Sequence, residues 1–83
     1  MTNQELIDKW NELTAANNHG EALQTLAHYL NMSKHENILQ HINAICDIEG
    51  HLPAGLHVYR ETIRVELFNV ARIVLGEEFR RLN

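Results

Sequence analysis

Apolar side chains recur every three or four positions along almost the whole of this 83-residue chain. In residues 6–13, for example, the apolar positions share one side of a helix, and the charged and amide positions share the other. That spacing is the period of an amphipathic α-helix, whereas a half-buried strand would alternate at every residue. One Pro and four Gly leave few positions that would break a helix. The sequence therefore predicts an all-α protein.

Turn-forming residues divide the chain into helical segments. Asn and Gly at 17–20, Gly50, and the Pro and Gly within 51–55 all favour helix ends. The expected fold is a compact four-helix single domain covering residues 1–83, with a fifth element if a short C-terminal turn is counted. The predicted helices span residues 3–17, 21–31, 34–49 and 56–75, and the short turn spans 77–82.

Two helix starts carry the spacing of a capping box, in which a hydroxyl and a carboxylate three residues later each satisfy a free backbone N–H group. Thr2 and Glu5 have this spacing before the first segment, and Ser33 and Glu36 have it before the third. We therefore predict that both pairs cap their helices.

The last long segment is ambiguous, because residues 63–67 alternate between apolar and charged side chains and are rich in β-branched residues, as in a strand. About twenty residues without a turn signal exceed the usual strand length of roughly three to ten residues. A helix is therefore the better prediction. Its main apolar stripe would comprise Leu56, Tyr59, Ile63, Leu67, Val70 and Val74.

Length and composition limit the class of protein. A domain of this size buries only about 60% of the surface that its unfolded chain exposes, so association with a second copy would add stability. Cys46 is the one cysteine, no secretory leader is evident, and no apolar run reaches the roughly 18 residues that span a bilayer. We expect a soluble, cytoplasmic protein without membrane contact.

Charge is unevenly distributed along the chain. Residues 1–50 carry seven acidic residues and two lysines, whereas residues 51–83 carry four acidic residues and five arginines. An acidic chain without a basic run lacks the charge that supplies most non-specific nucleic-acid affinity, so direct nucleic-acid binding is not expected. The candidate acidic surface comprises Glu5, Asp8, Glu12, Glu21, Glu36, Asp47 and Glu49.

Residues 26–33 resemble the first helix and turn of a helix-turn-helix DNA-binding protein, with Ala27 and Leu30 at the family's small and apolar positions. The family's turn glycine is replaced by Asn31, which also tolerates the left-handed conformation. The resemblance does not extend into the next helix, where the apolar residues are out of register. That helix would present Lys34, Glu36, His41 and Asn43 outward, a set with little attraction for phosphate.

Metal binding and catalysis have little support in the sequence. The six histidines are not spaced three or four apart on one helix, and we expect Cys46 to lie in a buried apolar stripe. No glycine-rich phosphate loop or activated nucleophile is recognisable. We therefore predict no catalytic residue, no metal ligand and no cofactor. Protonation of all six histidines would change the formal net charge from −4 to +2, so stability or self-association is expected to shift between about pH 5 and 7, unless the histidines titrate without consequence.

The fourth helix has a second apolar flank beside its main stripe, so more of its circumference is apolar than one core contact requires. Either the first helix covers this flank with Trp10, or a partner chain does, since interface centres favour aromatic residues and Arg. The candidate protein interface comprises Arg64, Val65, Phe68, Arg72, Leu75 and Phe79.

These observations favour a non-enzymatic, self-associating protein-binding module. A sharper version is a small acidic inhibitor or adaptor, of phage or mobile-element type, that blocks a nucleic-acid-handling protein by competing for its basic groove. The alternatives are a helix-turn-helix-like DNA-binding regulator and a purely structural homodimeric helical protein. The expected partners are a copy of the chain, a nucleic-acid-handling protein, or both.

Overall fold

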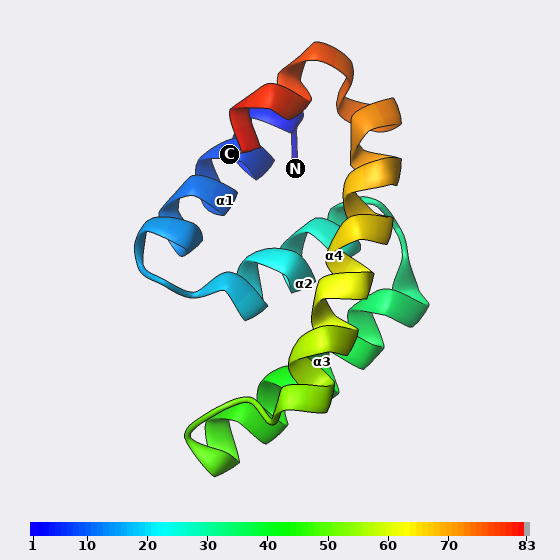
Figure 1. Ribbon diagram of the computed structural model, residues 1–83. Coiled ribbons are helices and arrows are strands. Elements are labelled where there is room, and N and C mark those ends of the chain that lie inside the picture. The colour runs from blue at the N-terminus through cyan, green and yellow to red at the C-terminus, as the bar shows by residue number, and fades with distance from the viewer. Residues whose placement is uncertain (83) are drawn as a thin grey trace.

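The computed structural model describes residues 1–82 and consists of helices, with no strand in that range. It confirms the all-α, four-helix prediction, and the ambiguous residues 63–67 are helical. The elements, in chain order, are α1 (Asn3–Ala15), α2 (His19–Tyr29), α3 (Ser33–Glu49), α4 (Ala54–Leu75) and the 3-10 helix η1 (Gly76–Leu82) (Figure 1).

The helices fold into a compact body of 36 × 24 × 18 Å. α1 packs on α2, α2 packs on α3, and the long α4 crosses back over both α2 and α3 (Figure 1). η1 returns the chain to α1, so the two ends of the molecule lie close together (Figure 1). Asn3 of α1 donates a hydrogen bond of 3.3 Å from its Nδ2 to Glu78 Oε1 at this junction.

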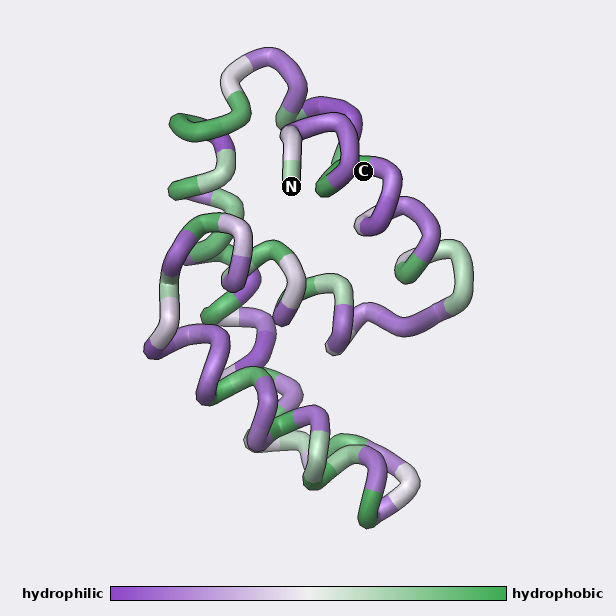
Figure 2. Tube along the Cα trace, turned by 180° about the vertical axis from the view of Figure 1, so that it is seen from behind, coloured by the Kyte–Doolittle hydropathy of each residue, from purple (hydrophilic) through white to green (hydrophobic). Residues whose placement is uncertain are grey.

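One hydrophobic core joins all five elements. Each helix contributes its apolar side to that core, and the hydrophilic positions alternate with them along the trace (Figure 2). None of the helices in the described part of the chain is long and apolar enough to cross a membrane. The buried residues are Leu6, Ile7, Trp10, Leu13, Ala22, Leu23, Leu26, Ala27, Leu39, Ile42, Ile63, Leu67, Ala71, Leu75 and Leu82.

The buried stripe of α4 differs from the predicted one. Ile63 and Leu67 are buried as expected, but Tyr59 and Val74 are 44% and 52% exposed, and Leu75 is buried. Buried positions four residues apart advance about 40° around a helix at each step. The buried stripe therefore winds around α4 along its length. A stripe read as straight along the helix misses this rotation.

The first predicted capping box is confirmed. The Thr2 Oγ1 atom accepts a 3.1 Å hydrogen bond from the Glu5 backbone N–H, and the Thr2 N–H donates to Glu5 Oε1 at 3.1 Å. Hydrogen bonding to the Glu5 carboxyl from Thr2, first from its backbone N–H and then from its side chain, lowers the pKa of that carboxyl below its ordinary value. The carboxylate also lies in the first turn of α1, where the helix dipole favours negative charge.

The second predicted capping box does not form. Met32 is the N-cap of α3, without a side-chain hydrogen bond, so Ser33 lies inside the helix. Asn31, with a φ of 58°, takes the left-handed conformation that was expected of it. The turn therefore ends at Met32, one residue before the predicted cap at Ser33. The Glu36 carboxylate contacts His28 Nδ1 at 2.9 Å instead of returning to the cap. A contact between helices thus replaces a local one.

The first connection is also shifted. α1 ends at Ala15 and α2 begins at His19, so Gly20 lies in the first turn of α2 and not in the loop. Asn17, with a φ of 63°, supplies the left-handed residue of the turn. α4 begins at Ala54, earlier than predicted, because Pro53 serves as its N-cap.

Candidate binding groove

A groove of about 730 Å³ lies between α2 and α3. Its walls come from the loop before α2, the outer side of α2, and the side of α3 that faces α2, and Arg60 of α4 closes one end. The side chains of Gln24 and Asn43 join the two walls, since Asn43 Nδ2 donates a 3.0 Å hydrogen bond to Gln24 Oε1. Amide and charged side chains therefore dominate this surface.

Gly20 allows the close approach of the two helices at the Arg60 end. A Cβ atom at this position would lie 2.3 Å from Asn43 Oδ1 and 3.5 Å from an Arg60 terminal nitrogen. Ordinary carbon–oxygen packing distances are well above the first value. The glycine therefore serves packing between α2, α3 and α4, and not the helix end that the sequence indicated.

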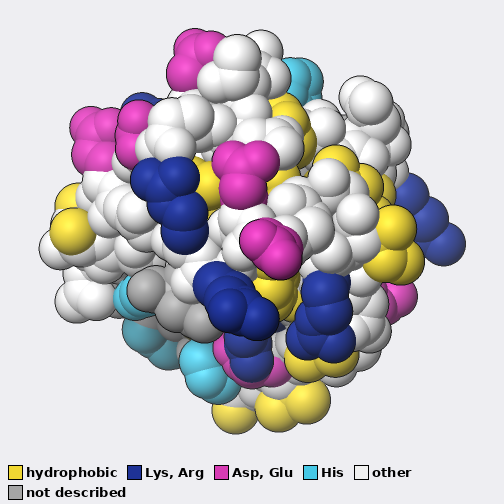
Figure 3. All heavy atoms as spheres, turned by 90° about the horizontal axis from the view of Figure 1, so that it is seen from above, with side chains coloured by type: hydrophobic (Ala, Val, Ile, Leu, Met, Phe, Trp, Pro, Cys, Tyr) yellow, Lys and Arg dark blue, Asp and Glu magenta, His cyan; other side chains and the backbone are white. Residues whose placement is uncertain are grey.

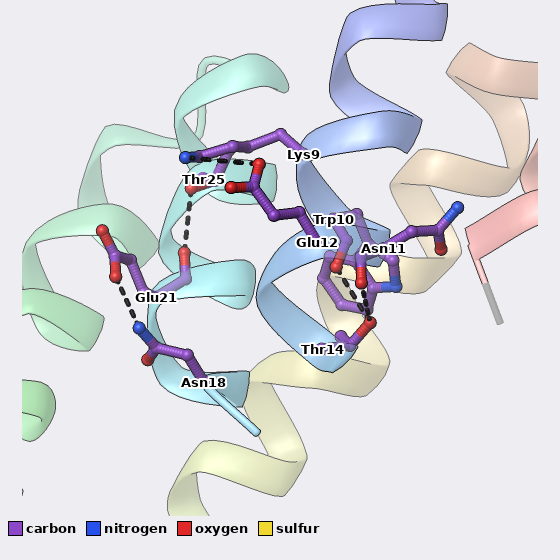
Figure 4. Close-up of polar contacts among 8 residues, drawn as sticks. All are labelled: Lys9, Trp10, Asn11, Glu12, Thr14, Asn18, Glu21 and Thr25. Atoms are coloured by element: carbon purple, nitrogen blue, oxygen red, sulfur yellow. Dashed lines mark hydrogen bonds and ion pairs between the residues drawn. The ribbon is translucent and has the colours of Figure 1, made fainter. Parts of the chain in front are cut away.

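The groove gathers three carboxylates, those of Glu21, Glu36 and Asp47. Two of them are held in place by neighbours. Asn18 Nδ2 donates to Glu21 Oε2 at 2.6 Å, as Figure 4 shows at the start of α2, and Glu36 contacts His28. We call this surface the acidic groove and define it by Glu21, Glu36 and Asp47.

The other residues of the predicted acidic surface lie elsewhere. Glu5, Asp8 and Glu12 are exposed on α1, and Glu49 is exposed at the end of α3. Glu12 pairs with Lys9 at 3.9 Å, as Figure 4 shows. The tertiary structure therefore divides the predicted acidic surface into a groove and a dispersed set on solvated helix faces.

The second apolar flank of α4 has partners inside the molecule. The Phe68 ring lies 5.6 Å from the Trp10 ring and 5.3 Å from the Phe79 ring, measured between centroids, and the second pair is T-shaped. Leu75 is buried. For these residues the structure takes the first of the two predicted alternatives, in which Trp10 of α1 covers the flank. Val65, by contrast, is 50% exposed.

The two arginines of the predicted interface stack on this aromatic cluster. The Arg64 guanidinium lies 5.3 Å from the Phe68 ring centroid, and that of Arg72 lies 5.4 Å from the Phe79 centroid. Both distances are in the range of cation–π contacts. The neighbouring end of the molecule, where α4 passes into η1, carries Arg side chains among acidic ones (Figure 3).

Large exposed apolar side chains occur along α3 and α4. Apart from Met1, those found in residues 1–82 lie on these two helices, and Ile48 and Ile73 are more than 80% exposed. The outer sides of α1 and α2 carry polar residues instead. The full set on α3 and α4 is Ile45, Ile48, Val58, Tyr59, Val65, Ile73 and Val74.

A second, smaller pocket of about 290 Å³ adjoins the acidic groove. It lies between α1, the start of α2 and the first half of α4, and His19 and Arg60 border both hollows. Trp10 and Leu23 form its apolar part, and His57 and Arg64 stand beside Arg60 on its charged side. Nothing in the sequence indicated this pocket, because its residues come from three helices.

The helix that follows the helix-turn-helix-like turn presents a different surface from the expected one. Lys34 and His41 are exposed, but Glu36 and Asn43 face α2, where they contact His28 and Gln24. These pairings remove two of the four expected outward side chains from the solvent side of α3.

Among residues 1–82, the His, Cys, Asp and Glu side chains form no group of three that could hold a metal ion. Cys46 is a free cysteine and lines the acidic groove, so it is partly exposed and not buried as predicted.

No protein-family model, curated protein or solved structure matches this chain. The candidate binding sites are therefore identified from its own surface. They are the acidic groove, the smaller pocket beside it, and the exposed apolar side chains of α3 and α4.

Proposed function

We propose that this protein is a non-enzymatic protein-binding module, and that its acidic groove receives a Lys- and Arg-rich segment of a nucleic-acid-handling protein. The observation that carries the proposal is the convergence of Glu21, Glu36 and Asp47 on one hollow, where Arg60 is the only Lys or Arg among the lining residues. In this role the protein is an inhibitor or adaptor that acts in the reducing cytoplasm, which suits its single free Cys46.

Charge complementarity supports this choice of partner. A basic segment that contacts phosphates carries a row of cations, and carboxylates in a concave surface can replace those phosphates as acceptors. The contacts of Glu21 with Asn18 and of Glu36 with His28 hold two of the carboxylates in place before binding. Pre-ordered side chains lose less conformational entropy when a partner binds.

The amides of the groove add further polar contacts. Gln24 and Asn43 bond to each other, and the remaining lone pairs and N–H groups of these two amides can bond to a peptide backbone. A segment seated here would therefore be held by charged groups at its side chains and by amides along its main chain. Its cations would no longer be available to a nucleic-acid phosphate.

A titration with a synthetic peptide of about ten Lys and Arg residues tests the proposal. We expect saturable binding by isothermal calorimetry, weakening as salt is raised, because salt screens exposed charges. Glu21→Lys and Asp47→Lys should each weaken binding roughly tenfold, since a reversed charge both removes an attraction and adds a repulsion. The matched control is Glu77→Lys, which makes the same charge change at an exposed position of η1.

Equal losses in all three variants would mean that net charge alone attracts the peptide, and the groove would be rejected as the site. A competition assay then tests blocking. The wild-type protein should release labelled duplex DNA from the basic peptide, and Asp47→Lys should release less. Release by neither protein would contradict the inhibitor role.

Self-association remains the second part of the proposal. It is supported by the exposed Ile73 and Val74 near the end of α4, because a second copy would remove these side chains from water. Sedimentation velocity across a range of concentrations measures it. A dimer that Ile73→Glu dissociates would support this surface, whereas a monomer at all concentrations would reject it. A dimer without groove activity would favour the purely structural alternative.

The DNA-binding alternative rests on the turn at Asn31 and receives less support, since Glu36 and Asn43 are engaged with α2. A gel-shift titration at low salt distinguishes the two. Sequence-preferring retardation of DNA by the purified protein would overturn the inhibitor proposal in favour of a regulator.

A further inference from the structure

The smaller pocket brings cationic side chains together over an apolar surface. Trp10 and Leu23, which are buried, belong to its lining, and Arg60 and Arg64 reach it from α4. His19 and His57 complete its polar side. We call this the cationic pocket.

The positive charge of the pocket is only partly balanced inside the molecule. Glu61 is the one carboxylate among the lining residues, and it is already bound to Arg64, whose Nε and Nη2 atoms each lie 3.0 Å from Glu61 Oε2. Within residues 1–82, Arg60 forms no hydrogen bond or ion pair. Asp47, which lines the neighbouring groove, does not pair with it either.

Arg60 is also partly buried, which makes an unmatched charge there costly. A guanidinium withdrawn from water is stabilised when an anion accepts its N–H groups, and its planar fork fits the two oxygens of a carboxylate or phosphate. The guanidinium lies beside the start of α2, since a Cβ added at Gly20 would lie 3.5 Å from one of its terminal nitrogens. The guanidinium therefore lines the pocket, and no other charged group among residues 1–82 pairs with it.

We infer that the cationic pocket binds an oxyanion, a carboxylate or a phosphate ester, that is carried on an aromatic or apolar group. Arg60 binds the anion, and Trp10 and Leu23 contact the apolar part. The volume of about 290 Å³ is at the lower end of ligand pockets, which suits a small molecule or a single group. This inference does not depend on the proposed function, because the carboxylates of the acidic groove take no part in it.

Trp10 provides a direct readout, because it is the only tryptophan in the chain and its indole N–H gives a single resonance in a nitrogen-correlated NMR spectrum. Benzoate and phenyl phosphate are the two probes, and they distinguish the carboxylate from the phosphate form of the ligand. We expect saturable shifts of the Trp10 resonance with at least one of them. Phenol, which lacks the charge, and inorganic phosphate, which lacks the ring, should each bind at least tenfold more weakly.

Variants locate the site. Arg60→Gln should weaken binding of the better probe roughly tenfold or more, and Arg60→Lys should restore part of it, because Lys keeps the charge without the planar fork. The matched control, Arg80→Gln, makes the same change at an exposed position of η1 and should leave affinity unchanged. His57→Glu, at an exposed position in the lining, should also abolish binding while the fold is retained.

Three results would overturn the inference: no saturable shift with either probe, equal binding of phenol, or unchanged affinity in Arg60→Gln and His57→Glu. Circular dichroism melts of each variant show whether a loss of binding reflects unfolding. Peptide binding by Glu21→Lys and Asp47→Lys tests the groove separately, so failure of the pocket and failure of the groove are distinguishable.

Discussion

The Trp10 and Phe68 rings lie 5.6 Å apart at an angle of 58°, and this contact joins α1 to α4 across most of the sequence. Phe79, in η1, packs against Phe68 in a T-shaped contact. The three rings therefore form one cluster, which also joins η1 to α4. The cluster explains why α4 carries apolar residues on more than one side. Part of the second apolar flank of α4, which suggested a partner chain, is therefore covered by residues of the same molecule.

Phe68→Ala should therefore destabilise the fold by about 2–3 kcal/mol. Complete burial of Phe would put the loss higher, but this side chain is only partly buried. Chemical denaturation followed by Trp10 fluorescence measures the change at the contact itself. Val65→Ala, on the same flank but 50% exposed, is the control and should change stability by less than about 0.5 kcal/mol. Equal losses for the two variants would contradict the packing described.

Gly20→Ala should destabilise the protein by about 1 kcal/mol, although alanine is the better helix former. The added Cβ displaces the Asn43 side chain and with it the hydrogen bond to Gln24. In an Asn43→Ala background the same substitution should be neutral or stabilising, by up to about 1 kcal/mol. Thermal melts of the four proteins give the coupling between the two sites, and additive effects would show that Gly20 and Asn43 do not meet.

The two sequence motifs for helix capping should respond differently to alanine. Thr2→Ala removes a side-chain cap that is present and should cost about 1 kcal/mol. Ser33→Ala removes no cap, because Met32 holds that position, and should change stability by less than about 0.5 kcal/mol. Urea unfolding of the pair measures both. If Ser33→Ala lost as much stability as Thr2→Ala, the capping box predicted for α3 would be supported after all.

Acid should weaken the α1 capping box. The pKa of Glu5 is lower in the folded protein than its ordinary value of 4.5, so its stabilising effect is present above pH 4.5 and is lost as the pH falls through the folded pKa. Glu5→Gln should therefore melt below the wild type at neutral pH, and the gap should close as the pH drops below 4.5. A gap that stays constant into acid would mean that the carboxylate charge does not matter there.

Local features of the fold were predictable from the sequence because they depend on neighbouring residues. The helical period, the Thr2 and Glu5 cap, and the left-handed asparagine at 31 involve groups within a few positions of one another. Ser33 shows the limit. Its capping motif is local, but the Glu36 carboxylate contacts His28 of α2 instead of the α3 N-terminus. The motif alone does not show which of these two contacts is the more favourable.

The candidate sites depended on contacts that the sequence does not contain. The acidic residues were visible as a set, but only the crossing of α2 and α3 selects Glu21, Glu36 and Asp47 for one groove. The sequence analysis did not identify Arg60 as a candidate site residue. Its side chain lies beside Gly20, forty positions earlier in the chain, and only the fold brings the two together.

The sequence by itself determined that this chain forms helices and where they begin and end to within two residues, because backbone conformation follows short-range periodicity and capping. Only the tertiary structure decided that Phe68 turns inward to Trp10 and that Arg60 lines a pocket whose one carboxylate, Glu61, is bound to Arg64. Those outcomes depend on how helix faces meet in three dimensions. The pairing of faces is set by the shape and volume of side chains far apart in the chain.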